Sequence, residues 1–205
     1  MHALYMGIAV QAYYNRQVSI LVSSFFFPEL NAGKAHIKQI GVLLRAEIAD
    51  AQPTVGEFLL VYVRKFLDER VIEAVRASGR PAKIYGGPTR APEGPLLFCA
   101  PNQSTFQNDL IHCSALITTA GNQLVGEALY LKKPVLALPE LGNYEQYINA
   151  HFLRQSGAGD WTELSSFDAS TVKHFLERLG DFRASAPSQR LNGTATAIAE
   201  ISRFI

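Results

Sequence analysis

One stretch of the chain decides its fold: Leu116-Ile-Thr-Thr-Ala-Gly-Asn-Gln-Leu-Val-Gly-Glu-Ala-Leu-Tyr-Leu-Lys-Lys-Pro-Val-Leu-Ala-Leu-Pro139. Residues 115–118 are apolar or β-branched, as in a strand buried inside a parallel sheet. Residues 123–133 place apolar side chains at helical spacing, and Pro134 ends that helix before a second strand at 135–138. The stretch is therefore a βαβ unit in which a turn at Ala120-Gly121 joins the first strand to the helix.

That turn is a candidate site for an anionic ligand. Gly121 allows a sharp turn and leaves room for a ligand beside the main chain. Asn122 is expected to cap the helix. Backbone amides at a helix start attract anions, and open α/β sheets bind ligands at this edge. A tight βα turn without a ligand remains the alternative for Gly121.

Composition limits the class of protein. The chain has 205 residues, of which 48% are hydrophobic, so it is long and apolar enough to form a full core. The formal net charge of +1 argues against a nucleic-acid partner recruited by bulk charge. The two cysteines lie in apolar surroundings and are expected to be free thiols, with no metal site. No run is long enough to span a bilayer and no signal peptide is recognisable, so we expect a cytoplasmic protein, with a peripheral position at the membrane as an alternative.

The remaining chain alternates strands with helices. Strands are predicted at 58–63, 82–85, 95–100 and 158–161, and helices at 68–78, 104–114, 144–155, 170–179 and 188–205. This order predicts an α/β fold, a Rossmann-like parallel sheet with helices on both faces. We place that domain at residues 51–205. Residues 1–50 form a short helix-strand segment (helix 1–15, strand 18–27) and a linker.

Several motifs in this order resemble the carboxyl-terminal half of GT-B glycosyltransferases, most closely glycosyltransferase family 28. They are Ile117 to Glu127, Lys133 to Pro139, Glu145-Gln146, Asn149-Ala150 and Gly157-Ala158-Gly159. Residues 40–45 are also similar to the segment that joins the two domains of these enzymes. The resemblance implies one GT-B half, which binds a nucleotide-diphosphate sugar, most often a UDP-sugar, and needs no cofactor or metal.

The resemblance implies roles for the residues around the central turn. Ala120, Gly121 and Asn122 match the turn whose amides face the donor diphosphate. Glu127 matches the acid that accepts hydrogen bonds from ribose hydroxyls. A carboxylate about one and a half turns into a helix lies at a suitable height for this task. A solvated position on the helix surface is the alternative for Glu127.

Further contacts are implied on either side of the turn. Glu145 and Gln146 match the pair that holds the donor sugar, although an ordinary helix start explains an acid there too. Phe98, Cys99 and Ala100 match the segment whose backbone contacts the base. His112 is expected to be packed or on the surface, and His151 could face the cleft but lacks a placed partner for acid-base chemistry.

Two departures from the family are visible. The first strand of the domain is normally followed by a glycine-rich loop that touches the donor phosphates, whereas here Arg64 and Lys65 follow, and either could supply positive charge instead. In addition, only about fifty residues precede the linker, so they match a remnant or tail of an amino-terminal domain in a truncated chain. The catalytic base, which that domain supplies in GT-B enzymes, stays unknown.

We therefore expect a donor-binding domain for inverting, metal-independent sugar transfer to an acceptor hydroxyl. It would be a hexosyltransferase when completed by an acceptor-binding domain or subunit, and inactive alone. The alternatives are a non-catalytic nucleotide-sugar-binding subunit of a split enzyme, and a GT-B type nucleotide-sugar epimerase. Apolar residues within 1–30 also allow self-association. A dehydrogenase is disfavoured, because no Gly-x-Gly-x-x-Gly follows a first strand.

Overall fold

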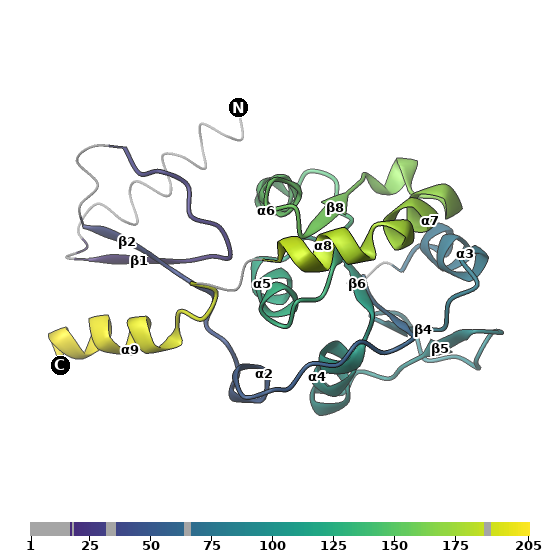
Figure 1. Cartoon of the computed structure of the whole chain (residues 1–205), viewed down its shortest axis with the longest axis horizontal. Helices are drawn as coiled ribbons and strands as arrows, with labels where there is room; N and C mark the ends of the chain where they lie inside the picture. The colour runs from purple at the N-terminus through teal and green to yellow at the C-terminus, as the bar shows by residue number, and fades with distance from the viewer. Residues whose placement is uncertain (1–16, 18, 32–35, 64–66, 187–189) are drawn as a thin grey trace.

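The computed structural model describes residues 17, 19–31, 36–63, 67–186 and 190–205, and its centre is a six-stranded parallel sheet (Figure 1). The strands are β3 (Leu59–Tyr62), β4 (Ala82–Tyr85), β5 (Leu96–Phe98), β6 (Ala115–Thr118), β7 (Val135–Ala137) and β8 (Gly159–Trp161). Their order in the sheet is β5-β4-β3-β6-β7-β8, and every neighbouring pair is parallel. The predicted fold class is confirmed.

Helices cover both faces of this sheet. On one face lie α4 (Gln103–His112), α5 (Asn122–Tyr130) and α6 (Tyr144–Gln155), and on the other lie α3 (Glu69–Ala77), α7 (Ala169–Glu177) and α8 (Leu179–Ser185). Side chains alternate between the two faces along each strand. Within β6, for example, Leu116 packs into the first core and Ile117 into the second, and both are fully buried. This two-sided burial explains why β6 is apolar throughout.

A smaller unit lies beside the sheet domain (Figure 1). Its strands β1 (Ile20–Ser23) and β2 (Ile37–Ile40) are parallel to each other. The last helix, α9 (Thr194–Ile201), returns to these strands and continues into the 3-10 turn η2 (Ser202–Phe204). An ion pair between Lys38 and Glu200 joins α9 to β2, and Gly193 donates its amide to the carbonyl of Val42 at 2.9 Å. The division at residues 50 and 51 stays a prediction.

The segment between the two units is held firmly. It contains the short helix α2 (Ala46–Ala49) where the sequence predicted only linker. The ammonium group of Lys133 is fully buried and donates to the carbonyls of Cys113, at 2.9 Å, and of Thr54. Burial lowers the pKa of Lys133. These bonds fasten the chain between α2 and β3 to the end of helix α5.

The remaining differences lie where local patterns are weak. Helix α8 was not predicted, the 3-10 turn η1 (Leu164–Ser166) precedes α7, and the terminal helix is shorter than the predicted 188–205. The predicted helix at 1–15 lies outside the described residues. Among the described residues, no helix is long and apolar enough to cross a membrane.

Candidate functional site

The sheet has its topological switch point between β3 and β6, because the chain moves outward in one direction through β4 and β5 and in the other through β7 and β8. Open α/β sheets bind ligands in the crevice at the carboxyl ends of such strands. A cleft of about 660 Å³ opens there, which we call the α5 cleft. It is lined by Leu43, Arg45, Tyr62, Tyr85, Gly86, Pro101, Asn102, Gln103, Phe106, Gln123, Leu124 and Glu127.

A second cavity of about 410 Å³ lies on the other side of the central turn. Val63 and Thr119 contribute to it from the ends of β3 and β6, and Arg70, Glu140 and Tyr147 complete much of its wall. The turn at 119–123 thus lies between the two hollows, with Thr119 lining one and the α5 residues at 123 and 124 lining the other.

The turn itself is open where the sequence predicts an anion. Gly121 is the N-cap of α5 with a φ of −70°, which any residue can adopt. A Cβ at this position would meet no described atom within 4 Å. Gly121 is therefore not required by the backbone conformation or by local packing. Its own amide donates to the carbonyl of Thr119 at 2.6 Å. The amides that remain for an anion belong to the first residues of α5.

The neighbours of Gly121 are more enclosed than predicted. Ala120 is fully buried, and its carbonyl accepts a hydrogen bond at 2.8 Å from the side-chain amide of Asn149. The side chain of Asn122 does not cap α5. Instead it donates to the carbonyl of Ser23 at 3.0 Å and accepts from the hydroxyl of Ser24 at 3.3 Å. The expected cap is thus wrong, and Asn122 links helix α5 to the smaller unit.

Glu127 lies on the wall of the α5 cleft beneath other side chains. Its side chain is 0% exposed. One carboxylate oxygen accepts from Arg45 Nε at 2.9 Å and from Gln123 Nε2 at 3.0 Å, and the other accepts from Arg45 Nη2. The solvated alternative for Glu127 is wrong. The guanidinium of Arg45 pairs with this buried carboxylate, and the Arg45 side chain is itself 33% exposed.

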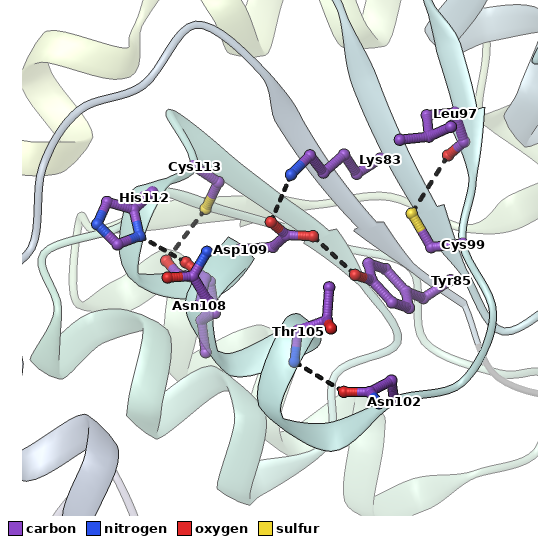
Figure 2. A network of polar contacts seen from close by, with 11 residues as sticks. Lys83, Tyr85, Leu97, Cys99, Asn102, Thr105, Asn108, Asp109, His112 and Cys113 are labelled. Carbon is purple, nitrogen blue, oxygen red and sulfur yellow. Dashed lines mark hydrogen bonds and ion pairs between the residues drawn. The ribbon is translucent and has the colours of Figure 1, made fainter.

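Aromatic side chains form the opposite part of the cleft. Tyr62 and Tyr85 end strands β3 and β4, and each packs edge-on against Phe106 of α4 at ring distances of 5.3 and 5.1 Å. Figure 2 shows how Tyr85 is held: its hydroxyl donates to Asp109 at 2.7 Å, and Asp109 also accepts from Lys83 at 2.5 Å. Burial and the bond to Asp109 raise the pKa of Tyr85 well above its ordinary value. The ring is therefore a neutral, fixed wall.

The segment predicted to contact a base is only partly accessible. Phe98 is buried, and the guanidinium of Arg90 lies 4.1 Å from its ring centre. The amide of Cys99 is engaged with the carbonyl of Ile84 at 2.8 Å, whereas Ala100 is exposed. The cleft wall begins just beyond it, with the residues at 101–103. Helix α4 starts there, and Asn102 caps it, because its side-chain oxygen accepts from the backbone amide of Thr105 at 2.9 Å.

The predicted sugar-binding pair lies at the start of α6. Glu145 is exposed in its first turn. Gln146 is buried, and its side-chain oxygen accepts the amide of Glu140 at 2.7 Å. Gln146 therefore positions the loop that lines the second cavity. Both interpretations of the pair, sugar contact and helix start, stay open.

Four residues named from the sequence remain: Arg64, Lys65, His112 and His151. Arg64 and Lys65 lie outside the described residues. The ring of His112 is bonded through Nδ1 to the carbonyl of Asn108 at 2.7 Å, and His151 is exposed beside Phe152. Within the described part of the chain, no group of three or more His, Cys, Asp or Glu side chains is placed to hold a metal ion.

Sequence reasoning missed several residues of the α5 cleft. Tyr62 and Tyr85 are the last residues of apolar strands, and that position at the carboxyl edge of the sheet is a signal that could have found them. Arg45 carries no such local signal, because its partner Glu127 is 82 residues away.

Comparisons with known proteins support the fold described above. The sequence model of the family described as "Glycosyl transferase family 1" matches residues 3–180. No curated protein matches the sequence. Among solved structures, the calicheamicin glycosyltransferase CalG4 superposes with a TM-score of 0.69 and 16% identity, over 99% of this chain and 60% of that one.

Two further structures were solved with nucleotides. Os79 from O. sativa, in complex with UDP, matches with a TM-score of 0.57 and 14% identity, over 83% of this chain and 50% of that one. Phytolacca americana UGT2, complexed with UDP-2fluoro-glucose and pterostilbene, matches with a TM-score of 0.58 and 13% identity, over 82% and 48%. The chain thus spans about half to three fifths of the length of these structures. It has the fold of a GT-B half, and by the match over residues 3–180 it belongs to glycosyl transferase family 1.

Proposed function

We propose that the chain binds a nucleotide-diphosphate sugar, in particular a UDP-sugar, and serves as the donor half of a glycosyltransferase. The base and ribose would occupy the α5 cleft, the diphosphate the turn at Gly121, and the sugar would extend toward the start of α6. The observation that carries this proposal is Gly121 itself. It faces open space at a helix start, with no conformational or packing need for glycine among the described residues.

The chemistry of the site supports this arrangement. Unpaired amides and the positive end of the α5 dipole favour a diphosphate, and they would stabilise the same group as it leaves during sugar transfer. Glu127, about one and a half turns further along α5, is suited to accept hydrogen bonds from a ribose diol. Tyr62 and Tyr85 offer an aromatic wall to a base. The relatives solved with UDP and a UDP-sugar point to the same ligand class.

We further propose that transfer is inverting and needs no metal, and that an acceptor-binding domain or subunit completes the enzyme. Among the described residues, β1 and β2 pair only with each other, and two parallel strands alone make a weak sheet. Several large apolar side chains nearby are exposed: Val22, Ile198, Ile201 and Phe204. These features suit a protein domain packed against the smaller unit, whether it belongs to the same polypeptide or another.

Calorimetric titration with UDP and UDP-sugars tests the binding proposal. Wild type should bind both, and UDP more tightly than ADP or GDP. Glu127→Gln should weaken UDP binding at least tenfold. Glu73→Gln is a matched control, because Glu73 is exposed on α3 on the other face of the sheet, and it should leave affinity unchanged. Absence of UDP binding at low salt would refute the proposal.

Activity separates the enzyme from the binding subunit. The purified chain should hydrolyse or transfer no sugar from a UDP-sugar by itself. Sugar transfer to an acceptor hydroxyl should appear only when an acceptor-binding domain is supplied. Transfer by the isolated chain would contradict the need for a second domain while leaving donor binding intact.

A further inference from the structure

Glu127 presents a conflict that the proposed function must resolve. Ribose hydroxyls have to reach its carboxylate, yet the side chain is 0% exposed and already accepts three hydrogen bonds from Arg45 and Gln123. A carboxylate offers about four acceptor positions, so little capacity remains for a diol even apart from access. Some of these donors must leave before a ribose can bind.

Arg45 is the donor that can move. Its backbone is fixed as the N-cap of α2, where its carbonyl accepts from the amides of Ile48 at 3.0 Å and Ala49 at 2.9 Å. Its side chain is 33% exposed, and the cleft lies directly in front of it. The side chain of Gln123 is more constrained, because the same side-chain nitrogen also donates to the carbonyl of Leu43 at 2.8 Å. The side chain of Arg45 can therefore swing from an anchored base.

Removing Arg45 from Glu127 has an electrostatic cost. A protein is strongly destabilised when a fully buried carboxylate loses its cation. Neutral ribose hydroxyls would replace the hydrogen bonds of the guanidinium but not its positive charge. A diphosphate restores the balance, because it brings negative charge into the same cleft. The guanidinium fork matches phosphate oxygens in geometry and charge. The helix rises roughly 9 Å between the turn and Glu127, a distance that a nucleotide bound at both ends would span.

We propose that Arg45 is an exchangeable counter-ion of the nucleotide site. It covers and neutralises Glu127 in the free protein, and it transfers its guanidinium to the diphosphate when a nucleoside diphosphate binds, which frees Glu127 for the ribose. This inference rests on the proposed function and adds a phosphate-binding residue to it. If Arg45 leaves Glu127 only for a phosphate, a ligand needs a phosphate group before its ribose can reach Glu127. Nucleosides, which carry no phosphate, should therefore bind poorly.

The test compares uridine, UMP and UDP on four proteins: wild type, Arg45→Gln, Glu127→Gln and the double variant. Direct titration measures UDP, and competition against UDP measures the weaker ligands. Arg45→Gln should weaken UDP at least tenfold while uridine stays within threefold of wild type or binds more tightly. When position 127 carries glutamine, the loss of Arg45 leaves no unpaired buried carboxylate, so the double variant should still fold. There Arg45→Gln should again weaken UDP at least tenfold relative to uridine.

Two results would overturn the inference alone. Equal weakening of uridine and UDP by Arg45→Gln would mean that Arg45 only holds Glu127 in place. No change in either affinity would mean that Arg45 does not meet the phosphates. If wild type binds none of the three ligands, the proposed function fails and this inference fails with it. Thermal melting of all four proteins confirms that affinity is compared between folded chains.

Discussion

Two glycines, five residues apart, occupy opposite environments in and beside helix α5. A Cβ on Gly126 would lie 2.4 Å from Cγ1 of Val42, a fully buried residue of the segment between the two units. A Cβ on Gly121 would meet nothing within 4 Å among the described residues. Gly126 is therefore explained by the fold, and Gly121 is not. A glycine without a structural reason, at a helix start beside a cleft, is where we propose that the ligand approaches the backbone.

The same contrast holds for two buried carboxylates. Asp109 is paired with Lys83 and Tyr85, which both belong to strand β4 of the same sheet (Figure 2). Glu127 is paired with Arg45, which lies outside the sheet and faces the cleft. The cations of the two pairs are similarly exposed, Lys83 at 32% and Arg45 at 33%, but Arg45 and Glu127 line the α5 cleft whereas Lys83 and Asp109 do not. The following experiments either break this division or sharpen it.

Gly126→Ala should cause the largest loss of stability. Alanine favours helix by about 1 kcal/mol over glycine, but the clash with Val42 outweighs this, and we expect a net loss of about 3 kcal/mol. Urea unfolding measures it. The double variant Val42→Ala/Gly126→Ala should be less destabilised than the two single changes added together. A Gly126→Ala protein as stable as wild type would contradict the assigned packing role.

Asp109→Asn should cost about 2 kcal/mol of unfolding free energy, because the buried acceptor of Tyr85 and Lys83 loses its charge. The loss stays moderate since Lys83 is 32% exposed and can be hydrated. Asp181→Asn, an exposed change on α8, is the control and should be neutral. Chemical denaturation of both variants checks this. A stable Asp109→Asn protein with lost UDP binding would move Asp109 from the scaffold to the ligand site.

Gly121→Ala should reverse the pattern of Gly126→Ala. We expect stability within about 0.5 kcal/mol of wild type, because the added methyl meets open space. UDP affinity should fall at least tenfold, about 1.4 kcal/mol, because that methyl stands where the diphosphate approaches. Gly180→Ala is the matched control: its Cβ also meets no described atom within 4 Å, but it lies on α8. Equal effects of the two changes on UDP binding would erase the distinction between the glycines.

The two cysteines also differ in burial, and the buried one, Cys113, predicts that stability depends on pH. Burial raises the pKa of Cys113 to about 12, so its thiol stays neutral in the fold while the unfolded chain ionises near pH 9. The stabilisation of the fold by this buried neutral thiol is therefore complete below pH 9, and it is lost as pH rises toward 12. At pH 10 this amounts to about 1 kcal/mol, visible as a difference in unfolding free energy between wild type and Cys113→Ala. A difference in unfolding free energy that does not change with pH would contradict this prediction.

Thiol labelling of the native chain should modify the half-buried Cys99 and spare Cys113.

The elements of the sheet domain were predictable because each has a strong local cause. Strand β6 and helix α6 were predicted with the bounds that they have, since continuous apolar residues and a clear helical period leave few alternatives. Helix α8 was missed because Gly180 and neighbouring polar residues weaken its pattern.

The site was less predictable because its contacts join distant parts of the chain. Asn122 looked like a helix cap, but Gly121 holds the N-cap position, and the side-chain oxygen of Asn122 accepts from the hydroxyl of Ser24, 98 residues away. The cover of Glu127 by Arg45 likewise depends on how the linker folds back over α5. Local patterns predicted helix α5, on which we propose the site is built. Only the tertiary structure revealed which groups already occupy its donors and acceptors.

The central claim is that the first amides of α5 hold the diphosphate, and amide hydrogen exchange measured by NMR tests it most directly. Addition of UDP should slow exchange at Asn122, Gln123 and Leu124, whereas addition of uridine should not. The same amides in Gly121→Ala should respond only at higher UDP concentration. Unchanged exchange at these three residues in a protein saturated with UDP would contradict the account.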